Sequence, residues 1–433
     1  MDIFVIAPGD EAFLWKECYV GGYICIGWDE GNPQVDVFVD QIKVGDIVLA
    51  KKGTGGIVGI GIVLSDYISQ SSAENPRKDK EYSRIRLVNW IKEFDPPCQF
   101  DSLAVKAVTH LHNPDQKARL DKFINVNNGL ITMDQLESES KQAVIRWIDD
   151  VKAKKEKEML NLLTTQKQII LQGPPGTGKT YLAEKLARLL LGSSAIKGEN
   201  WNIVQFHPAY TYEDFVRGIR VESKKDEKDQ NYVSYTTKNG ILGEFAAKAN
   251  KKENEGSNFV LIIDEINRAN LAGVLGELIY GLEYRGEPVA TPYEIEGSRS
   301  LVIPKNLYII GTLNTADRSI GHMDYAIRRR FSFIECPPRR DVLGEHYIKP
   351  GHAPLLKKAE YLFDLVEKIF KVHLSQDFSA SDVQIGHSYF MAGSEEELNM
   401  KLKYQIKPIL NEYLRDGVLR SECEVEIRDL AND

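Results

Sequence analysis

The sequence predicts an α/β fold built on a parallel sheet, with a small β-rich module before it and a helical region after it. Three observations carry this prediction. An apolar run at 169–171 leads into a glycine-rich loop and then into a helical pattern at 181–191. From residue 168 onward, strand-like segments alternate with helical ones, which is typical of a parallel sheet. Short apolar segments separated by glycine turns occupy residues 1–110 and favour a small barrel.

The glycine-rich loop matches the phosphate-binding pattern G-x-x-x-x-G-K-[ST]. It reads Gly173-Pro174-Pro175-Gly176-Thr177-Gly178-Lys179-Thr180 and is followed by Tyr181. Its glycines let successive backbone N–H groups point at phosphate oxygens, and the next helix adds the positive end of its dipole. We expect Lys179 to reach the β- and γ-phosphates and the Thr180 hydroxyl to ligate Mg²⁺. A chance match in a turn is the alternative, and the strand–loop–helix context disfavours it.

Two later strands are predicted to end in polar side chains. The apolar run 259–263 ends in Asp264 and Glu265, about 85 residues after Lys179. Asp264 is expected to hold Mg²⁺ through water and Glu265 to orient or deprotonate the attacking water. Alone, such a carboxylate pair would be interpreted as a solvated strand end, but the phosphate loop favours the functional interpretation. The run 308–313 ends in Asn314, which is either a water-positioning amide or a turn residue.

Three consecutive arginines, Arg328, Arg329 and Arg330, stand near the end of a predicted helix. They either complement the helix dipole or supply an arginine that stabilises charge on the transferred phosphoryl group. Consecutive helical residues point in different directions, so at most one or two of them can face one phosphate site. The others remain free for contacts between subunits.

The order of these motifs resembles the AAA+ class of ring-forming ATPases and GTPases, and more closely the McrB-type proteins of modification-dependent restriction systems. The segments 264–270 (DEINRAN), 313–319 (LNTADRS), 206–215 (FHPAYTYEDF) and 385–390 (IGHSYF) carry this resemblance. It covers roughly residues 160–395.

The resemblance implies GTP rather than ATP hydrolysis, a hexameric ring, and stimulation by a McrC-type nuclease partner. It adds Asn314, Asp317 and Arg318 to the catalytic set and makes Arg329 and Arg330 the leading trans-acting arginines. The sequence lacks the guanine-reading N-K-x-D motif of small GTPases. The choice of GTP over ATP therefore depends on the resemblance alone.

Segments of the N-terminal module resemble EVE-type domains of the PUA superfamily, several of which read a modified base flipped out of DNA. These segments are 22–30, 45–52 and 56–63. Reading a flipped base requires aromatic stacking faces and polar groups for the base edge. The candidates for such a pocket are Trp15, Tyr23, Trp28, Asp29 and Trp90. The alternative is that these aromatic side chains fill the core of a small barrel.

Charge gives little support for nonspecific DNA binding. The whole chain of 433 residues has a formal net charge of −8, and residues 1–110 hold 11 basic against 16 acidic side chains. One cluster of basic residues is an exception: Arg77, Lys78, Lys80, Arg84 and Arg86. It could contact the DNA backbone beside the pocket, and the favoured alternative is that it forms a solvated loop.

Composition and length bound the remaining expectations. The five scattered cysteines form no C-x-x-C pair, no apolar run is long enough for a membrane span, and the first residues lack a basic signal-peptide region. We therefore expect a cytoplasmic protein without membrane association. The expected domains are a reader at 1–115, a helical linker at 116–160, the nucleotide-binding domain at 161–340 and a helical lid at 341–433.

Two other functions remain open from the sequence. The chain could be an ATP-driven, MoxR-like remodelling chaperone whose N-terminal module binds a protein client. It could also be a non-enzymatic scaffold whose nucleotide site controls assembly only. The full set of Lys179, Asp264, Glu265, Asn314 and Arg329 disfavours the scaffold.

Overall fold

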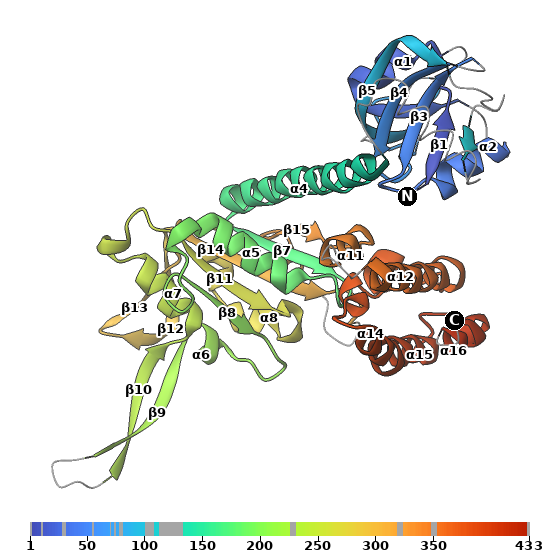
Figure 1. Cartoon of the computed structure of the whole chain (residues 1–433). Coiled ribbons are helices and arrows are strands. Elements are labelled where there is room, and N and C mark those ends of the chain that lie inside the picture. Colours follow the sequence, from blue (N-terminus) through green and yellow to red (C-terminus); the bar gives the residue numbers. More distant parts are fainter. Residues whose placement is uncertain are drawn as a thin grey trace. The chain divides into compact units, whose positions relative to one another are not determined.

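The computed structural model describes residues 2–9, 12–27, 32–53, 56–69, 71–72, 75–77, 81–99, 108–111, 133–225, 231–317, 324–347 and 353–430. These residues form two compact units, Met1–Lys154 and Lys155–Asp433. The long helix α4 (Met133–Gln166) contains the boundary between them (Figure 1). Each unit has its own hydrophobic core, and each is described separately below.

The N-terminal unit is built on a six-stranded sheet in the order β2-β5-β4-β3-β1-β6. All neighbouring strands are antiparallel except β1 and β3, which are parallel. The strands are β1 (Ile3–Ile6), β2 (Tyr23–Ile26), β3 (Ile47–Lys52), β4 (Gly56–Val63), β5 (Arg84–Gln99) and β6 (Val108–His110). Helices α1 (Trp15–Gly21) and α2 (Pro33–Asp36) accompany them. The N-terminal unit is therefore α+β, with helix α1 between strands β1 and β2.

Three of the predicted pocket aromatics pack in this core instead. Trp15 is 8% exposed, and its indole N–H donates to Glu93 Oε1 at 2.9 Å. Its ring lies edge-on to Trp90, whose own N–H donates to the Cys18 carbonyl. Tyr23 is 2% exposed and donates to Glu17. The burial of Trp15 and Tyr23 favours the alternative that these two side chains fill the core, whereas Trp90 is only partly buried. Trp28 and Asp29 lie outside the described residues.

The basic cluster is not a solvated loop where the structure describes it. Arg77, Arg84 and Arg86 are all less than 9% exposed. The Arg86 guanidinium donates to the carbonyls of Phe38, Ser65 and Val39, and its burial lowers its pKa to about 10. Arg77 forms an ion pair with Glu17 at 2.6 Å. These arginines tie chain segments together inside the fold, and Lys78 and Lys80 lie outside the described residues.

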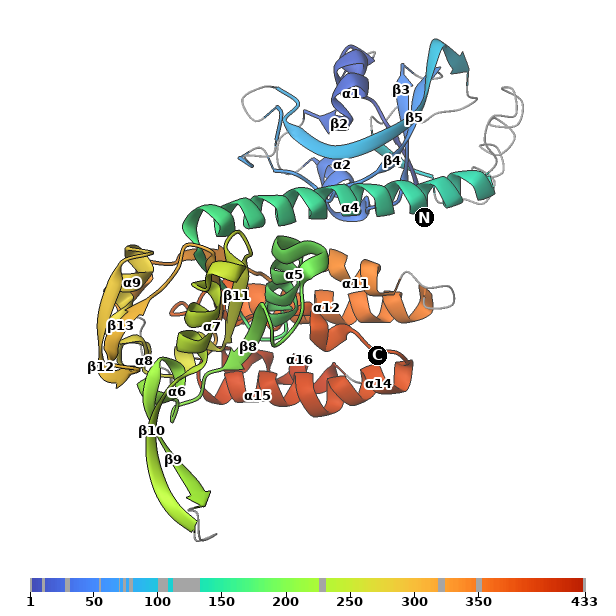
Figure 2. The ribbon, with the colours of Figure 1, turned by 90° about the vertical axis from the view of Figure 1, so that its left-hand side faces the viewer.

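The second unit is centred on a five-stranded parallel sheet in the order β15-β7-β14-β11-β8. Its strands are β7 (Gln168–Gly173), β8 (Trp201–Gln205), β11 (Phe259–Asp264), β14 (Leu307–Asn314) and β15 (Ser332–Glu335). Strands β7, β11 and β14 are almost entirely buried, as their continuous apolar runs predict. The helices that accompany the sheet are α5 (Lys179–Leu191), α6 (Tyr212–Phe215), α7 (Ile241–Ala249), α8 (Leu271–Leu275) and α9 (Leu278–Glu283), all labelled in Figure 2, and α10 (Tyr325–Arg328).

Two antiparallel hairpins extend this unit. The first, β9 (Arg217–Lys225) with β10 (Asn231–Asn239), projects away from the sheet (Figure 1). The second is β12 (Pro288–Ile295) with β13 (Ser298–Val302). Arg217 joins the two hairpins through hydrogen bonds to Thr291 and Tyr293.

The C-terminal residues form a helical lid with a separate core. Its helices are α11 (Asp341–His346), α12 (Ala353–His373), α13 (Ala380–Val383), α14 (Glu395–Lys401), α15 (Lys407–Arg415) and α16 (Glu424–Asp429). Their apolar faces meet at residues such as Phe370, Phe390 and Leu410, all fully buried. Among the described residues, no helix combines the length and the apolar character that crossing a bilayer would require.

Candidate nucleotide-binding and hydrolysis site

Strand register brings the predicted motifs together. Asn314 on β14 pairs with Gly173 at the end of β7, and Asp264 on β11 pairs with Gln205 at the end of β8. Because the strands are parallel, their carboxyl ends meet at one edge of the sheet, where α/β proteins bind ligands.

The phosphate loop has the backbone geometry that its glycines allow. Gly176 and Gly178 have φ angles of 81° and 76°, in the left-handed region that favours glycine. Gly178 is also the N-cap residue of α5. A Cβ on Gly173 would lie 2.3 Å from the Cys336 carbonyl oxygen, so the close approach of β15 also requires glycine there.

Lys179 is folded back onto this loop. Its Nζ donates to the carbonyls of Gly173 and Pro174 at 2.9 and 2.8 Å. Burial lowers the pKa of Lys179 to about 8, because the charged ammonium loses water in this position. A nucleotide phosphate would supply the negative charge that the ammonium lacks here.

Thr180 and Asp264 provide the oxygen atoms expected at a Mg²⁺ site. Thr180 Oγ1 donates to Asp264 Oδ1 at 2.7 Å, and Thr312 Oγ1 donates to the same oxygen at 2.6 Å. A hydroxyl and a carboxylate beside the phosphate loop fit Mg²⁺, which takes few protein oxygens and keeps waters and phosphate oxygens as its other ligands. The described residues contain no group of three or more His, Cys, Asp or Glu side chains that could enclose a metal. When bound, Mg²⁺ would neutralise charge on the phosphates.

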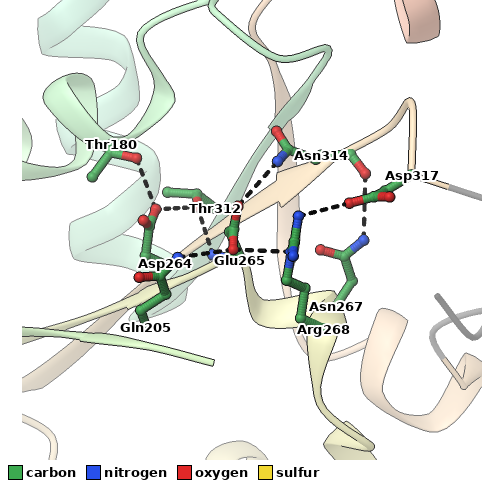
Figure 3. Close-up of polar contacts among 9 residues, drawn as sticks. All are labelled: Thr180, Gln205, Asp264, Glu265, Asn267, Arg268, Thr312, Asn314 and Asp317. Atoms are coloured by element: carbon green, nitrogen blue, oxygen red, sulfur yellow. Dashed lines mark hydrogen bonds and ion pairs between the residues drawn. The ribbon is translucent and has the colours of Figure 1, made fainter. Parts of the chain in front are cut away.

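Glu265 is the most heavily engaged side chain of the site. Its backbone is left-handed, with φ of 52°, and its N–H donates to Thr312 Oγ1. Its Oε2 accepts a hydrogen bond from Gln205 Nε2 at 2.9 Å and lies 2.9 Å from Arg268 Nε. Its Oε1 accepts from Asn314 Nδ2 at 3.4 Å (Figure 3). Asn314 therefore contacts the predicted base.

A second layer of contacts joins the ends of β11 and β14. Arg268 bridges Glu265 and Asp317, with its second contact at 3.1 Å. Asn267 Nδ2 donates to the Asn314 carbonyl at 3.3 Å (Figure 3). Asp317, predicted to be catalytic, thus reaches Glu265 through Arg268. Arg318 lies outside the described residues.

These side chains surround a pocket of about 240 Å³. It is lined by Gly176, Gly178, Lys179, Thr180, Tyr181, Asp264, Glu265, Thr312 and Asn314. Tyr181 stands at its rim and is 73% exposed. Of the other loop residues, Thr177 donates to the Pro174 carbonyl and is buried, and the Pro175 carbonyl accepts a bond from the lid.

The three predicted arginines are not among the residues that line this pocket, and they differ from one another. The Arg329 side chain is 67% exposed and lies 3.8 Å from Glu283. The Arg330 side chain is 9% exposed and forms a 2.6 Å ion pair with the same carboxylate, while Arg328 lies over the Phe333 ring. Arg330 thus has an internal partner, whereas Arg328 and Arg329 are both exposed.

The lid docks on the phosphate loop through the segment 386–389. The N–H of Gly386 donates to the Pro175 carbonyl and that of Ser388 to the Gly176 carbonyl, at 2.8 and 3.0 Å. His387 is 7% exposed and accepts the Arg339 N–H on Nδ1. Burial, reinforced by the nearby Arg339 charge, lowers the pKa of His387 to about 4, so the ring is neutral at pH 7.

Four contributors to the site were not predicted from the sequence: Gln205, Thr312, Arg268 and the lid segment. Gln205 ends a strand-like run as Asp264 does, which could have marked it. Arg268 stands within a segment quoted for the family resemblance, and Thr312 within the predicted strand before Asn314. Their contacts depend on strand register and on the turn after β11.

Comparison with known proteins supports this geometry. Residues 168–331 match the model of an AAA domain of the dynein-related subfamily, and residues 372–420 match the McrB alpha-helical lid domain. Residues 30–112 match a domain of unknown function, and no match supports the expected EVE/PUA-like assignment of the N-terminal unit.

Three relatives show how far the likeness extends. The chain is 41% identical over 285 residues to the type IV methyl-directed restriction enzyme EcoKMcrB subunit of Escherichia coli K12, covering 61% of this chain and 57% of that protein. It is 30% identical over 194 residues to the type II restriction enzyme BsuMI component YdiS of Bacillus subtilis, covering 38% of this chain and 55% of that protein. Protein sickie of Drosophila melanogaster is 26% identical over 272 residues, which cover 60% of this chain and 11% of that protein.

The chain spans somewhat more than half of the length of the two restriction proteins that it matches. Sheet order, site geometry and the two family matches agree on the second unit. The second unit of this chain is an AAA+ nucleoside-triphosphatase domain that carries an McrB-type helical lid.

Proposed function

We propose that this protein is the motor subunit of a modification-dependent restriction system. It would hydrolyse GTP in an oligomeric ring, probe DNA for a modified base through its N-terminal unit and drive a McrC-type partner nuclease. The observation that carries the proposal is the hydrolytic constellation of Lys179, Asp264, Glu265 and Asn314 in an AAA+ domain with an McrB-type lid.

The geometry supports hydrolysis more than simple nucleotide binding. Glu265 lies beside the pocket as the base, Asn314 contacts it, and Thr180 and Asp264 offer oxygens to Mg²⁺. A scaffold that only senses nucleotide would need no such base. Because Arg329 is exposed and is not a pocket-lining residue, we propose that it completes the site of a neighbouring subunit in the ring.

DNA recognition is assigned to the N-terminal unit because the second unit accounts for the motor. Trp15 and Tyr23 are buried and Trp90 is partly buried with its N–H bonded to Cys18, so the proposal keeps Trp28 and Asp29 as the base-reading residues. Support for a methylated base comes from the relative described as methyl-directed.

The test is nucleotide turnover by the purified full chain, with GTP and ATP compared at several protein concentrations. The proposal expects GTP-selective turnover that rises with concentration, because each site needs an arginine from a neighbour. Lys179→Ala should abolish turnover while the full chain still binds a methylated duplex more tightly than the same unmethylated duplex. Equal binding of the two duplexes would contradict the reader assignment, and concentration-independent turnover would contradict the shared site.

One observation favours a second function, the ATP-driven, MoxR-like remodelling chaperone. The projecting β9–β10 hairpin exposes Ile219, Val221, Val233 and Tyr235, which register places on one face. Such an apolar face suits a protein client. ATP-selective turnover, stimulated by an unfolded protein and indifferent to methylated DNA, would replace the restriction proposal with this one.

A further inference from the structure

One short segment of the lid, residues 382–388, contacts two different loops at one edge of the AAA+ sheet. Residues 386–388 bond to the phosphate loop through the backbone, from Gly386 to Pro175 and from Ser388 to Gly176. The contact is close, since a Cβ on Gly386 would lie 2.1 Å from the Gly176 backbone. A shift of the phosphate loop therefore requires a shift of this segment.

The same segment also holds the loop that follows β14. Thr315 Oγ1 donates to the Asp382 carbonyl at the end of α13, at 2.6 Å. The next residue, Ala316, packs against the hydrophobic core of the lid. Between the two attachment points, Val383 and Ile385 are buried in that core, so 382–388 is fixed to the rest of the lid.

The loop after β14 carries the residues that contact the proposed base. Asn314, directly before Thr315, donates to Glu265 Oε1 at 3.4 Å. Asp317, two residues after Thr315, binds Arg268, which in turn contacts Glu265. The 3.4 Å Asn314–Glu265 distance is long for a hydrogen bond, so a small displacement of this loop changes it strongly.

We propose that Thr315 is a positioning residue: its hydroxyl fastens the loop that carries Asn314 and Asp317 to the lid, so that the state of the phosphate loop sets the placement of Asn314 against Glu265. This inference rests on the proposed nucleotide hydrolysis. Phosphate binding moves Lys179 and the loop carbonyls that it now contacts, the lid segment follows through Gly386 and Ser388, and Thr315 passes the movement to Asn314.

The test compares Thr315→Val, which keeps the shape but removes the hydroxyl, with Thr315→Ser, which keeps the hydroxyl. Loss of one hydrogen bond that acts on the hydrolytic step should lower kcat roughly five- to tenfold. KM should stay within about twofold, because the phosphate loop itself is intact. Thr315→Ser should restore kcat to within about twofold of the parent.

Ser381→Ala is the matched control. It removes an exposed hydroxyl on the same helix, α13, that forms a hydrogen bond with Ser379, and should leave both constants unchanged. The inference would be overturned if Thr315→Val had an unaltered kcat or raised KM by the same factor as it lowered kcat. It would also be overturned if Thr315→Ser lowered kcat as much as Thr315→Val does.

A second readout does not require turnover. Amide hydrogen exchange is measured in the full chain with and without Mg²⁺ and a non-hydrolysable GTP or ATP analogue. In the parent, exchange should slow together in peptides covering 173–180, 380–390 and 310–317. In Thr315→Val, exchange should still slow in the peptides covering 173–180 and 380–390, but not in the peptide covering 310–317. Slower exchange in all three peptides of the variant would contradict the inference, whether or not the parent protein hydrolyses a nucleotide. Absence of hydrolysis of both GTP and ATP by the parent protein would refute the proposed function instead.

Discussion

Arg268 Nε lies 2.9 Å from Glu265 Oε2, and Nη2 of the same guanidinium contacts Asp317 Oδ2 at 3.1 Å. One arginine thus joins the proposed base at the end of β11 to the loop after β14. The ion pair forms because the left-handed backbone of Glu265 starts a tight turn, which brings residue 268 back over residue 265. The base is therefore restrained from three sides, by Gln205, Arg268 and Asn314.

The first prediction concerns this bridge. Arg268→Ala and Asp317→Ala should each lower turnover by roughly tenfold or more, because each breaks the link between Glu265 and the loop that carries Asn314. The double variant should be no slower than the worse single variant, since the two changes remove one shared contact. The measurement is kcat for the parent, the two single variants and the double variant. If the factor by which kcat falls in the double variant equals the product of the two single factors, the two residues act separately.

The second prediction concerns the pH dependence of nucleotide affinity. The pKa of Lys179 is lowered to about 8, against 10.5 for a free lysine, so the ammonium deprotonates as the pH rises through 8. Phosphate binds the ammonium, and affinity should therefore weaken between pH 7 and 9, with a limit of about tenfold per pH unit above 8. Without nucleotide, Lys179 binds more protons in the unfolded chain than in the folded chain between about pH 8 and 10.5. Its contribution to the free energy of unfolding therefore rises with pH in this range.

Lys179→Arg is the control for this pH effect. A guanidinium keeps its charge throughout this range, so the affinity of this variant should lose the Lys179-dependent slope. Fluorescence titration with a labelled nucleotide at several pH values measures it. An identical slope in the parent and in Lys179→Arg would assign the pH dependence to another group.

The third prediction separates the two arginines. Arg330→Ala should destabilise the fold by about 1–3 kcal/mol, because the change removes a mostly buried side chain together with its 2.6 Å ion pair to Glu283. Arg329→Ala should leave the melting temperature unchanged, because its side chain is 67% exposed, but should abolish turnover. Thermal melts and turnover of both variants check this, and a stable but active Arg329→Ala would exclude Arg329 from the reaction.

Mixing variants tests whether Arg329 acts between subunits. Glu265→Gln and Arg329→Ala should each be inactive alone, since the first lacks the base and the second lacks the arginine. An equimolar mixture should recover roughly a quarter of the parent turnover, because that share of randomly formed interfaces joins an intact Glu265 to an intact Arg329. An inactive mixture whose subunits demonstrably co-assemble would place Arg329 in its own subunit's chemistry.

The fourth prediction concerns the attachment of the lid. Gly386→Ala should weaken nucleotide binding by about tenfold or more, because the new Cβ would meet the Gly176 backbone at 2.1 Å and displace the lid from the phosphate loop. Gly344→Ala, in helix α11 of the same lid, has no heavy atom within 4 Å of its new Cβ and should bind normally. Comparable losses in the two variants would show that the effect is a general loosening of the lid.

The N-terminal unit shows where composition and local pattern are insufficient. Aromatic side chains suggested a pocket, yet Trp15 packs edge to face with the partly buried Trp90 at the core. Clustered arginines suggested a surface, yet Arg86 is 1% exposed and binds three carbonyls. A residue type states which contacts a side chain can make, whereas its burial depends on which strands pair around it.

In the AAA+ domain, the sequence by itself determined the strand–loop–helix unit and the helical nature of the lid, and it predicted that Lys179, Thr180, Asp264 and Glu265 belong to one site, where they line one pocket. These features follow from local spacing, apolar periodicity and glycine chemistry, all of which are visible along the chain. Only the tertiary structure decided that Gln205, Thr312 and Arg268 surround Glu265 and Asp264, and that Arg330 is buried while Arg329 is exposed. Those relationships depend on the register of non-consecutive parallel strands and on the docking of the lid, which bring together residues that are far apart in the sequence.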